Sequence, residues 1–429
     1  MSDACKSIRF RDHHGTGLGS QRNAGMTRDR PRLSGTNLER AADHNQRVTL
    51  HAIRVGSALT RVELAHITGL TAPAIANITK RLLQDGLIEE AGQRRGGRGQ
   101  PPTRLVVRRD ACYAIGINVD RDHVTLVLVD FAGQTLSRKS EEIDFALPGD
   151  VQAFYRRSVR AMLKSAEVEA SQLVGVGVAV PDDLGSVELP GRPAAYAEWE
   201  SADFAALFAQ PFALPVFVEN DAAAAASGEM QLGLGQRYGN FFYILLSSGL
   251  GGGFVSDGVY ARGAHGRSGE LGFMLAPDEN GQREQVQRLV SLSGLAEHLG
   301  GDGLKLDAVL RRGELAPEAR ASVERWIERA ARRLCTPLDA INCLIDPAVV
   351  LIGGRLPSGL LELLASRANA LIGAATNAPS VARVERAALS EDAPAVGAAI
   401  LPFSHFLLPK PGALWKAPAA ADGAVRVGA

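Results

Sequence analysis

The sequence predicts an α/β protein in which a short, basic, helical segment precedes a much larger region of alternating strands and helices. Residues 39–110 carry apolar side chains at helical spacing and end in a glycine-rich hairpin pattern. Residues 111–407 alternate short apolar runs with alanine-rich stretches and glycine turns, which indicates strands alternating with helices. A chain of 429 residues is also long enough to bury two or three hydrophobic cores.

The two ends of the chain lack this apolar periodicity. Residues 1–38 are rich in Gly, Ser, Arg and Asp and are expected to form a disordered leader, within which Met26 is an alternative start. Residues 408–429, with three prolines among many Ala and Gly, are expected to form a flexible tail. The expected folded domains are therefore 39–110 and 111–407.

The composition excludes several classes of protein. The net charge is zero and the pI is about 7.1, so any nucleic-acid binding must come from a local basic patch. The four cysteines are far apart, with no zinc or redox spacing. No run approaches the ~20 apolar residues of a membrane span, and the first residues lack the apolar centre of a secretory signal. We expect a cytoplasmic protein without disulfides or membrane contact.

The first domain has the pattern of a helix-turn-helix. A first helix is expected over Asn45–Val55. Thr60, with a glutamate three residues later, forms a capping box that begins a second helix, and Gly69 suits the end of that helix. Thr71 then caps a third helix with Pro73 in its first turn, where proline is tolerated. In this layout the last helix enters the major groove of DNA.

A hairpin with a basic tip follows. Leu87–Glu90 and Thr103–Val107 are the expected strands, and the tip between them contains Arg94, Arg95 and Arg98 among glycines. A slim glycine backbone approaches DNA closely, and arginines are attracted to a narrow minor groove. The hairpin is therefore expected to be the wing of a winged helix-turn-helix.

The charge of this domain favours the same interpretation. Residues 44–110 contain eleven basic and five acidic residues in an otherwise neutral chain. The alternative is a protein-docking domain whose basic face is solvated. The expected DNA-contacting residues are Thr71, Pro73, Asn77, Lys80, Arg81, Arg94, Arg95 and Arg98.

The second domain contains strands that end in polar or glycine-rich loops, which is where α/β folds bind ligands. The expected strands and loops are Tyr113–Asp120, Thr125–Asp130, Val174–Pro181, Pro215–Asp221, Phe241–Leu246 followed by Ser247–Gly253, and Ala348–Gly354.

Four short motifs of this domain occur in a recognisable order. They are Glu219-Asn220-Asp221, Ser248–Gly253, Gly269–Gly272, and Asp346-Pro347 with Gly353-Gly354. With them, residues 40–405 resemble the ROK family (repressor, open reading frame, kinase). The resemblance implies a two-lobed, actin-like or ribonuclease-H-like sugar-kinase fold. The preceding winged helix is similar to that of the family's regulators, such as the xylose and N-acetylglucosamine repressors.

The resemblance also implies a sugar site. Asn220, Asp221 and Glu270 match residues that bind sugar hydroxyls in the family, and Asp221 matches the general base of its kinases. Carboxylates and amides can bond two hydroxyls at once and so distinguish epimers. The alternative role of these three side chains is to cap strand ends and turns.

Two departures from the family pattern predict that phosphotransfer and metal binding are lost. Asn118–Asp122 stands where family kinases have Asp-x-Gly-Gly-Thr, and its aspartates would repel a triphosphate. The glycine loop Ser248–Gly253 remains, as a nucleotide loop or as a packing turn. Phe273 replaces the family's zinc-binding histidine, residues 279–290 contain no cysteine, and Gln287 replaces a sugar-binding glutamate. We therefore expect neither a metal nor a cofactor.

Together these features predict a sugar-responsive, DNA-binding transcription regulator without catalytic residues. It is expected to repress genes of carbohydrate uptake or catabolism, binding double-stranded operator DNA as a homodimer or homotetramer. Two alternatives remain open: an active sugar kinase with an accessory DNA-binding domain, and a constitutive DNA-binding repressor with a vestigial cleft. The identity of the sugar, the operator and the sign of regulation do not follow from the sequence.

Overall fold

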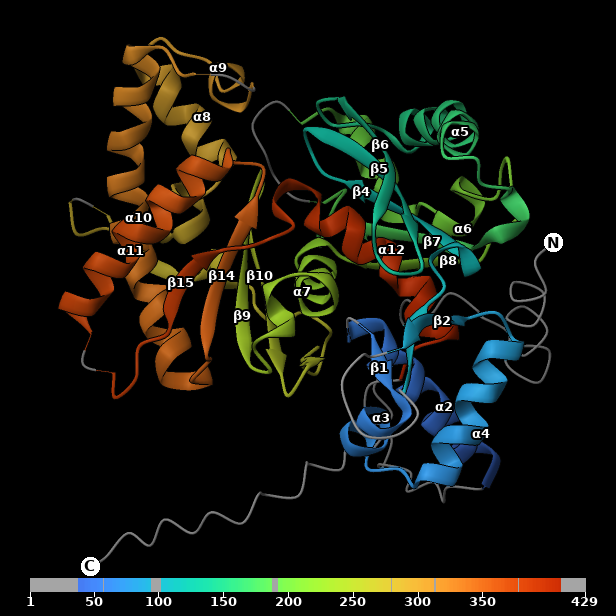
Figure 1. Ribbon diagram of the computed structural model, residues 1–429. Coiled ribbons are helices and arrows are strands. Elements are labelled where there is room, and N and C mark those ends of the chain that lie inside the picture. Colours follow the sequence, from blue (N-terminus) through green and yellow to red (C-terminus); the bar gives the residue numbers. More distant parts are fainter. Residues whose placement is uncertain are drawn as a thin grey trace, which may run out of the picture. The chain divides into compact units, whose positions relative to one another are not determined.

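The computed structural model (Figure 1) describes residues 38–56, 58–93, 102–186, 192–278, 280–311, 314–376 and 378–409. They form two compact units. The first contains the described residues up to Cys112 and those from Phe403 onward, and the second is Tyr113–Pro402.

The first unit contains three helices and a small sheet of order β1-β3-β2, the arrangement of a winged helix-turn-helix. The predicted caps are confirmed: Thr60 forms a capping box with Glu63, and Thr71 accepts from the backbone N–H of Ala74. Gly69 ends the second helix in the left-handed conformation, with φ of 68°. The elements are α2 (Leu38–Val55), β1 (Leu59–Thr60), α3 (Arg61–Thr68), α4 (Ala72–Gln84), β2 (Ile88–Gln93) and β3 (Thr103–Val107).

The first unit also differs from the sequence prediction. Helix α2 begins at Leu38 rather than at Asn45, because the residues before Asn45 include good helix formers that lack the apolar periodicity on which the prediction depended. Residues from Phe403 onward group with this unit, although the sequence placed the domain end at 407. Arg47 of α2 donates from Nη1 to the carbonyl oxygens of His405 and Leu408, at 3.1 and 3.2 Å.

The second unit contains two five-stranded sheets of the same topology, which we call the first and second lobe. Their strand orders are β6-β5-β4-β7-β8 and β11-β10-β9-β14-β15, so that in each lobe three antiparallel strands adjoin two parallel ones. This confirms the predicted two-lobed fold. The strands are β4 (Tyr113–Val119), β5 (His123–Asp130), β6 (Thr135–Glu142), β7 (Leu173–Val180), β8 (Val216–Asn220), β9 (Phe241–Leu246), β10 (Leu250–Ser256), β11 (Val259–Tyr260), β14 (Val349–Gly354) and β15 (Arg383–Arg386), with a separate hairpin of β12 (Leu275–Pro277) and β13 (Arg283–Gln285).

Each lobe has its own hydrophobic core beneath a helical layer. In the first lobe α5 contributes Phe154 and Tyr155 to a core that also contains Trp199. In the second lobe the long helix α10 buries Trp326 completely. The helices of these layers are α5 (Pro148–Ser165), α6 (Phe204–Leu207), α8 (Leu292–Gly301), α9 (Asp307–Leu310), α10 (Pro317–Ile345) and α11 (Ser358–Ala375).

Two helices of small residues, α7 (Asp221–Leu232) and α12 (Ala393–Phe406), lie between the two sheets (Figure 1). A Cβ atom on Gly397 of α12 would lie 1.8 Å from the carbonyl oxygen of Ala224 of α7, so only glycine fits there. Likewise, a Cβ on Gly116 of β4 would lie 1.9 Å from the carbonyl oxygen of Ala395. We call the α7–α12 contact the glycine–alanine seam; it consists of Ala224, Gly228, Ala393 and Gly397.

None of the helices in the described ranges is long and apolar enough to cross a membrane.

Candidate functional site

The candidate site surrounds two turns that hold the same position in the two lobes. Asp120–Asp122 connects β4 to β5, and Ser247–Gly249 connects β9 to β10. The turns lie close to each other: the Ser248 side chain is near enough to Asp122 to lower the pKa of its carboxyl. A Cβ atom on Gly249 would lie 3.2 Å from Nη1 of Arg121. The protein's own side chains therefore fill the space between the two turns.

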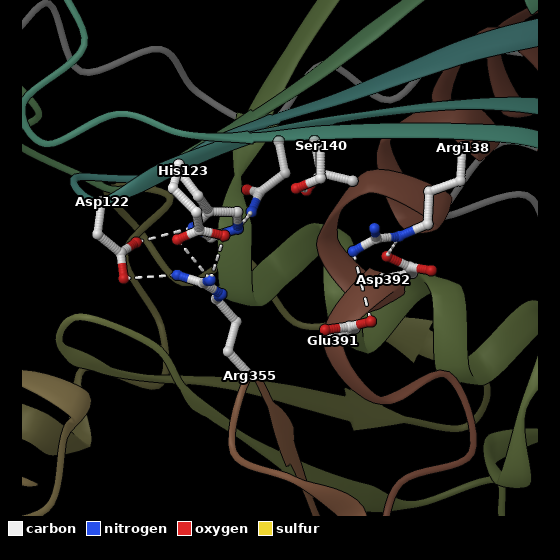
Figure 2. Close-up of polar contacts among 10 residues, drawn as sticks. Asp122, His123, Arg138, Ser140, Arg355, Glu391 and Asp392 are labelled. Atoms are coloured by element: carbon white, nitrogen blue, oxygen red, sulfur yellow. Dashed lines mark hydrogen bonds and ion pairs between the residues drawn. The ribbon is translucent and has the colours of Figure 1, made fainter. Parts of the chain in front are cut away.

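An arginine of the second lobe anchors this contact (Figure 2). Nη1 of Arg355, which follows β14, donates to Asp122 Oδ2 at 2.6 Å, and its Nη2 donates to Glu142 at 2.6 Å. The other oxygen of Asp122 lies 2.7 Å from Nδ1 of His123, a residue that is 3% exposed. We call Asp122, His123, Glu142 and Arg355 the Arg355 cluster. It joins the two lobes at the turn Asp120–Asp122.

The charges of the cluster fix the ionisation of Asp122. Burial by itself would raise the pKa of this carboxyl, but the hydrogen bond from His123 and the positive charge of Arg355 lower it to about 2. Asp122 is therefore an anion at neutral pH, and the guanidinium of Arg355 is already bound to it.

Asp120, Asp122 and His123 are also close enough to share a metal ion, since one ligand atom from each lies within 4.8 Å of the others. Both oxygens of Asp122 are already used, one by His123 and one by Arg355. A metal ion would have to displace the guanidinium. We therefore assign Asp122 and His123 to an ion-pair network, whereas Asp120 accepts from the backbone N–H of Arg121.

Asn220 and Asp221 lie at the start of α7, directly after β8. Asn220 caps the helix by accepting from the N–H of Ala223 at 3.0 Å, which is the capping role that the sequence left open. Asp221 is 7% exposed, and burial together with the nearby negative charge of Asp120 raises its pKa to about 7. The carboxyl of Asp221, which has both neutral and charged forms near neutral pH, thus faces the turn Asp120–Asp122.

Glu270 is held by an arginine that the sequence analysis did not identify. Nε of Arg267 donates to Glu270 at 3.3 Å, and its Nη2 donates to Asp183 at 2.5 Å. Burial, followed by the adjacent charge of Asp182, raises the pKa of Glu270. Asp182 also acts on the carboxyl of Asp221, so it lies near both predicted sugar contacts.

The surviving glycine loop is a packing element. A Cβ on Gly252 would lie 2.5 Å from the carbonyl oxygen of Gly269, and one on Gly253 would lie 2.7 Å from the Cβ of Ala226. A Cβ on Gly251 would also lie close to α7, 3.0 Å from the Cβ of Ala222. Packing against α7 and the Gly269 loop accounts for these three glycines without a nucleotide.

Phe273 and Gln287, the two residues expected to depart from the family's zinc and sugar ligands, lie near this loop. Phe273 is 49% exposed, and Gln287 places its Oε1 3.1 Å from where a Cβ on Gly272 would be. Nε2 of Gln287 donates to Gln285 at 2.9 Å. The amide of Gln287 thus lies at the Gly-Glu-x-Gly motif, where the family has its additional sugar-binding glutamate.

In the first unit the predicted DNA contacts of the third helix lie on one exposed face of α4. They are Thr71, at its N-terminal cap, and Pro73, Asn77, Lys80 and Arg81. The opposite face is buried through Ile75, Thr79 and Leu82. Arg94, Arg95 and Arg98 of the predicted wing tip lie outside the described residues.

The second unit has two ribonuclease-H-like lobes with a carboxylate-lined site between them, and a winged helix-turn-helix precedes it in the chain. These features define a protein of the sugar-kinase fold with an added N-terminal unit. Residues 114–404 match the ROK family, and the chain belongs to that family.

Proteins that are similar to the chain in sequence include regulators. The "Uncharacterized protein y4fQ" of Sinorhizobium fredii is 30% identical over 84% of this chain and 90% of its own length. The xylose repressor of Bacillus subtilis is 27% identical over 56% of this chain and 62% of its own length.

Among solved structures, a ROK family transcriptional regulator homologous to the E. coli MLC protein has a TM-score of 0.61 at 19% identity, covering 85% of this chain and 97% of its own. A ROK family glucokinase from Streptomyces griseus has a TM-score of 0.52 at 24% identity, covering 67% and 98%.

Proposed function

We propose that this protein is a sugar-responsive, DNA-binding transcription regulator of carbohydrate genes whose second unit senses a sugar and does not transfer phosphate. The observation that carries the proposal is the Arg355 cluster, which occupies the place of the first phosphate loop. Repression is the proposed sign, in line with the names of the xylose and N-acetylglucosamine repressors among its relatives.

The chemistry of the turn argues against a kinase. A phosphate loop presents backbone N–H groups to the triphosphate, and phosphoryl transfer depends on that positioning. Here the N–H of Arg121 is bound by Asp120 at 2.7 Å, and the partly buried carboxylate of Asp122 would face the phosphates. Like charges at this distance in a partly buried site repel strongly. Arg355 neutralises Asp122 from within the chain instead.

The first unit supports the DNA-binding part. Helix α4 is held by its buried face, so its exposed face of Thr71, Asn77, Lys80 and Arg81 is available to a duplex. A homodimer or homotetramer would present two such helices to a two-fold symmetric operator. A coupling of about 1–3 kcal/mol between sugar and operator binding would be enough for a useful switch.

A coupled ADP-release assay over a panel of hexoses and pentoses tests the loss of phosphotransfer. The purified chain is expected to release no more ADP than its Asp221→Asn variant. Sugar-dependent ADP release that disappears in Asp221→Asn would instead identify an active kinase.

Selection of genomic fragments by the purified chain, followed by fluorescence anisotropy on the selected sequence, tests the regulator. We expect specific binding that at least one member of a sugar panel weakens. Specific binding that no sugar changes would favour a constitutive repressor with a vestigial cleft, and no specific binding would contradict the proposal as a whole.

A further inference from the structure

Residues 261–268 form a loop whose base is fixed on the second lobe. The loop follows β11, and the Ser268 hydroxyl closes its base by donating to the carbonyl oxygen of Ala261. None of its residues is buried, so the loop adds no buried side chain to the hydrophobic cores. Gly263 and Gly266 have φ of 70° and 74°, a conformation that favours glycine. Apolar burial therefore does little to hold this loop in place.

Ion pairs attach the loop to the first lobe instead. Arg262, near one end, donates from both Nη atoms to the carboxylate of Glu219 on β8. Arg267, near the other end, donates from Nη2 to Asp183 at 2.5 Å, and its Nε lies 3.4 Å from Asp182. The two arginine side chains are 60% and 42% exposed. Water and salt can therefore compete with these ion pairs.

Both ion pairs lie at the predicted sugar contacts. β7 and β8 are neighbouring parallel strands, with Val180 paired to Asn220, so the residues that end or follow them lie at one edge of the sheet. The carboxyl ends of the strands are where α/β folds bind ligands. One ion pair uses Glu219, the neighbour of Asn220 in the chain, and the arginine of the other also donates to Glu270 at 3.3 Å. The loop therefore reaches across this edge of the sheet.

We propose that residues 261–268 act as a latch over the predicted sugar contacts, and we call them the latch loop. The Arg262–Glu219 and Arg267–Asp183 pairs close the latch. Asp221, which is 7% exposed, becomes accessible to a ligand when they open. This inference rests on the proposed function, because it states how a ligand reaches the site of that sensor. Since exposed ion pairs are individually weak, the latch opens often and responds to salt.

Limited proteolysis of the full chain tests the latch without a ligand. Trypsin cleaves after arginine, and cleavage after Arg262 and Arg267 follows the open fraction of the loop when opening and closing are fast. Glu219→Gln and Asp183→Asn each remove one carboxylate and leave both cleavage sites in place. Asparagine also tolerates the left-handed conformation of residue 183, where φ is 57°. Each variant is expected to speed cleavage about twofold to fivefold, and the double variant about tenfold.

A control variant and a salt series accompany the proteolysis. Glu141→Gln is the matched control, because Glu141 pairs with the exposed Arg157 on β6, at the opposite edge of the sheet from β8. It is expected to leave cleavage of the latch loop unchanged. Raising NaCl from about 0.05 M to about 0.5 M should speed this cleavage about threefold in the parent chain and change the double variant little. A short reporter peptide corrects for the effect of salt on trypsin itself. Equal cleavage of parent and double variant overturns the proposal.

Carboxyl labelling tests whether the loop covers the site. A water-soluble carbodiimide couples an added amine to accessible carboxyls, and mass spectrometry locates the product on Asp221. This labelling should rise in the double variant, and in the parent chain at high salt, by about the same factor as the cleavage. Glu229, which is 0% exposed on the same helix, is the internal control for unfolding. If Glu229 is labelled as well, the variant has unfolded and the salt series of the parent chain decides.

Two outcomes separate this inference from the function beneath it, since neither measurement uses a sugar or DNA. Faster cleavage with unchanged labelling of Asp221 would mean that the loop opens without covering the site, and the latch would be wrong. If cleavage and labelling respond as expected but no sugar changes operator binding, the latch stands and the sensor is wrong.

Discussion

The first turns of the two lobes hold equivalent places in one topology and have opposite chemistry. Each joins the first and second strands of a five-stranded sheet through three residues. The turn of the second lobe, Ser247–Gly249, is small and neutral, whereas that of the first, Asp120–Asp122, is charged and tied by Arg355 across the lobes. The comparison shows that one turn of this topology can be small and neutral or part of an ion-pair network, while the sheet that carries it keeps its pairing.

The largest effect is expected from breaking the charged turn. Arg355→Ala should destabilise the protein by about 3 kcal/mol, because it leaves the carboxylate of Asp122 partly buried without its cation. Urea unfolding measures the change. Arg138→Ala is the matched control (Figure 2), since Arg138 pairs with Asp392 and Glu391 at a more exposed position and should cost about 0.5 kcal/mol or less. Equal losses in the two variants would mean that the Arg355 cluster is an ordinary surface ion pair.

The next effect concerns the carboxyl facing that turn. The pKa of Asp221 is raised to about 7, so between about pH 4 and pH 7 the folded chain keeps a proton that the unfolded chain has lost. Folding stability contributed by this group therefore falls as pH rises through that window. Asp221→Asn removes the dependence, and its stability relative to the parent should be greater at pH 8 than at pH 5 by about 2 kcal/mol. Melting curves at both pH values check this; the same difference at both would show that Asp221 titrates at its ordinary pKa.

The neutral turn leads into glycines that are required for packing. Gly252→Ala should cost about 2 kcal/mol, because its Cβ would meet the backbone oxygen of Gly269 at 2.5 Å. Gly249→Ala should cost less than about 1 kcal/mol, because its nearest neighbour, at 3.2 Å, is the mobile end of the Arg121 side chain. Chemical denaturation of both variants compares them directly. The reverse order would indicate that Gly249, at the turn itself, is the residue under constraint.

The smallest effect lies in the first unit. Lys80→Ala should weaken binding to selected DNA about tenfold and reduce the salt dependence of binding by about one phosphate contact. Lys164→Ala, an exposed lysine of α5, serves as the control. Salt titrations by fluorescence anisotropy measure both, and an equal response of the two variants would argue against α4 as the DNA-reading helix.

Local patterns allowed much of the fold to be predicted. The capping box at Thr60, the turn at Gly69 and the cap at Thr71 each depend on residues within four positions of one another, and all three are confirmed. The strands that lead into Asp120 and Asp221 were likewise evident as apolar runs. The two-residue strand β1 was not predicted, because it is too short to show any periodicity.

The chemistry of the site was only partly accessible from sequence. The altered residues at Asn118–Asp122 were visible, but their partner Arg355 lies 233 residues from Asp122 and carries no local signal. Arg267 was missed for the same reason: its importance comes from its partner Asp183, which lies on another segment. Long-range ion pairs are determined by tertiary packing, which a one-dimensional pattern does not contain.

The glycine–alanine seam between α7 and α12 bears on how the second unit can move. Side chains that interdigitate resist sliding, whereas glycine and alanine present nearly smooth backbones to each other. A ligand that draws the lobes together would therefore meet little resistance at the seam, and the exposed ion pairs of Arg267 and Arg262 would provide part of the resistance. Exposed ion pairs weaken as the salt concentration rises. Higher ionic strength should therefore allow the two lobes to move more easily relative to each other.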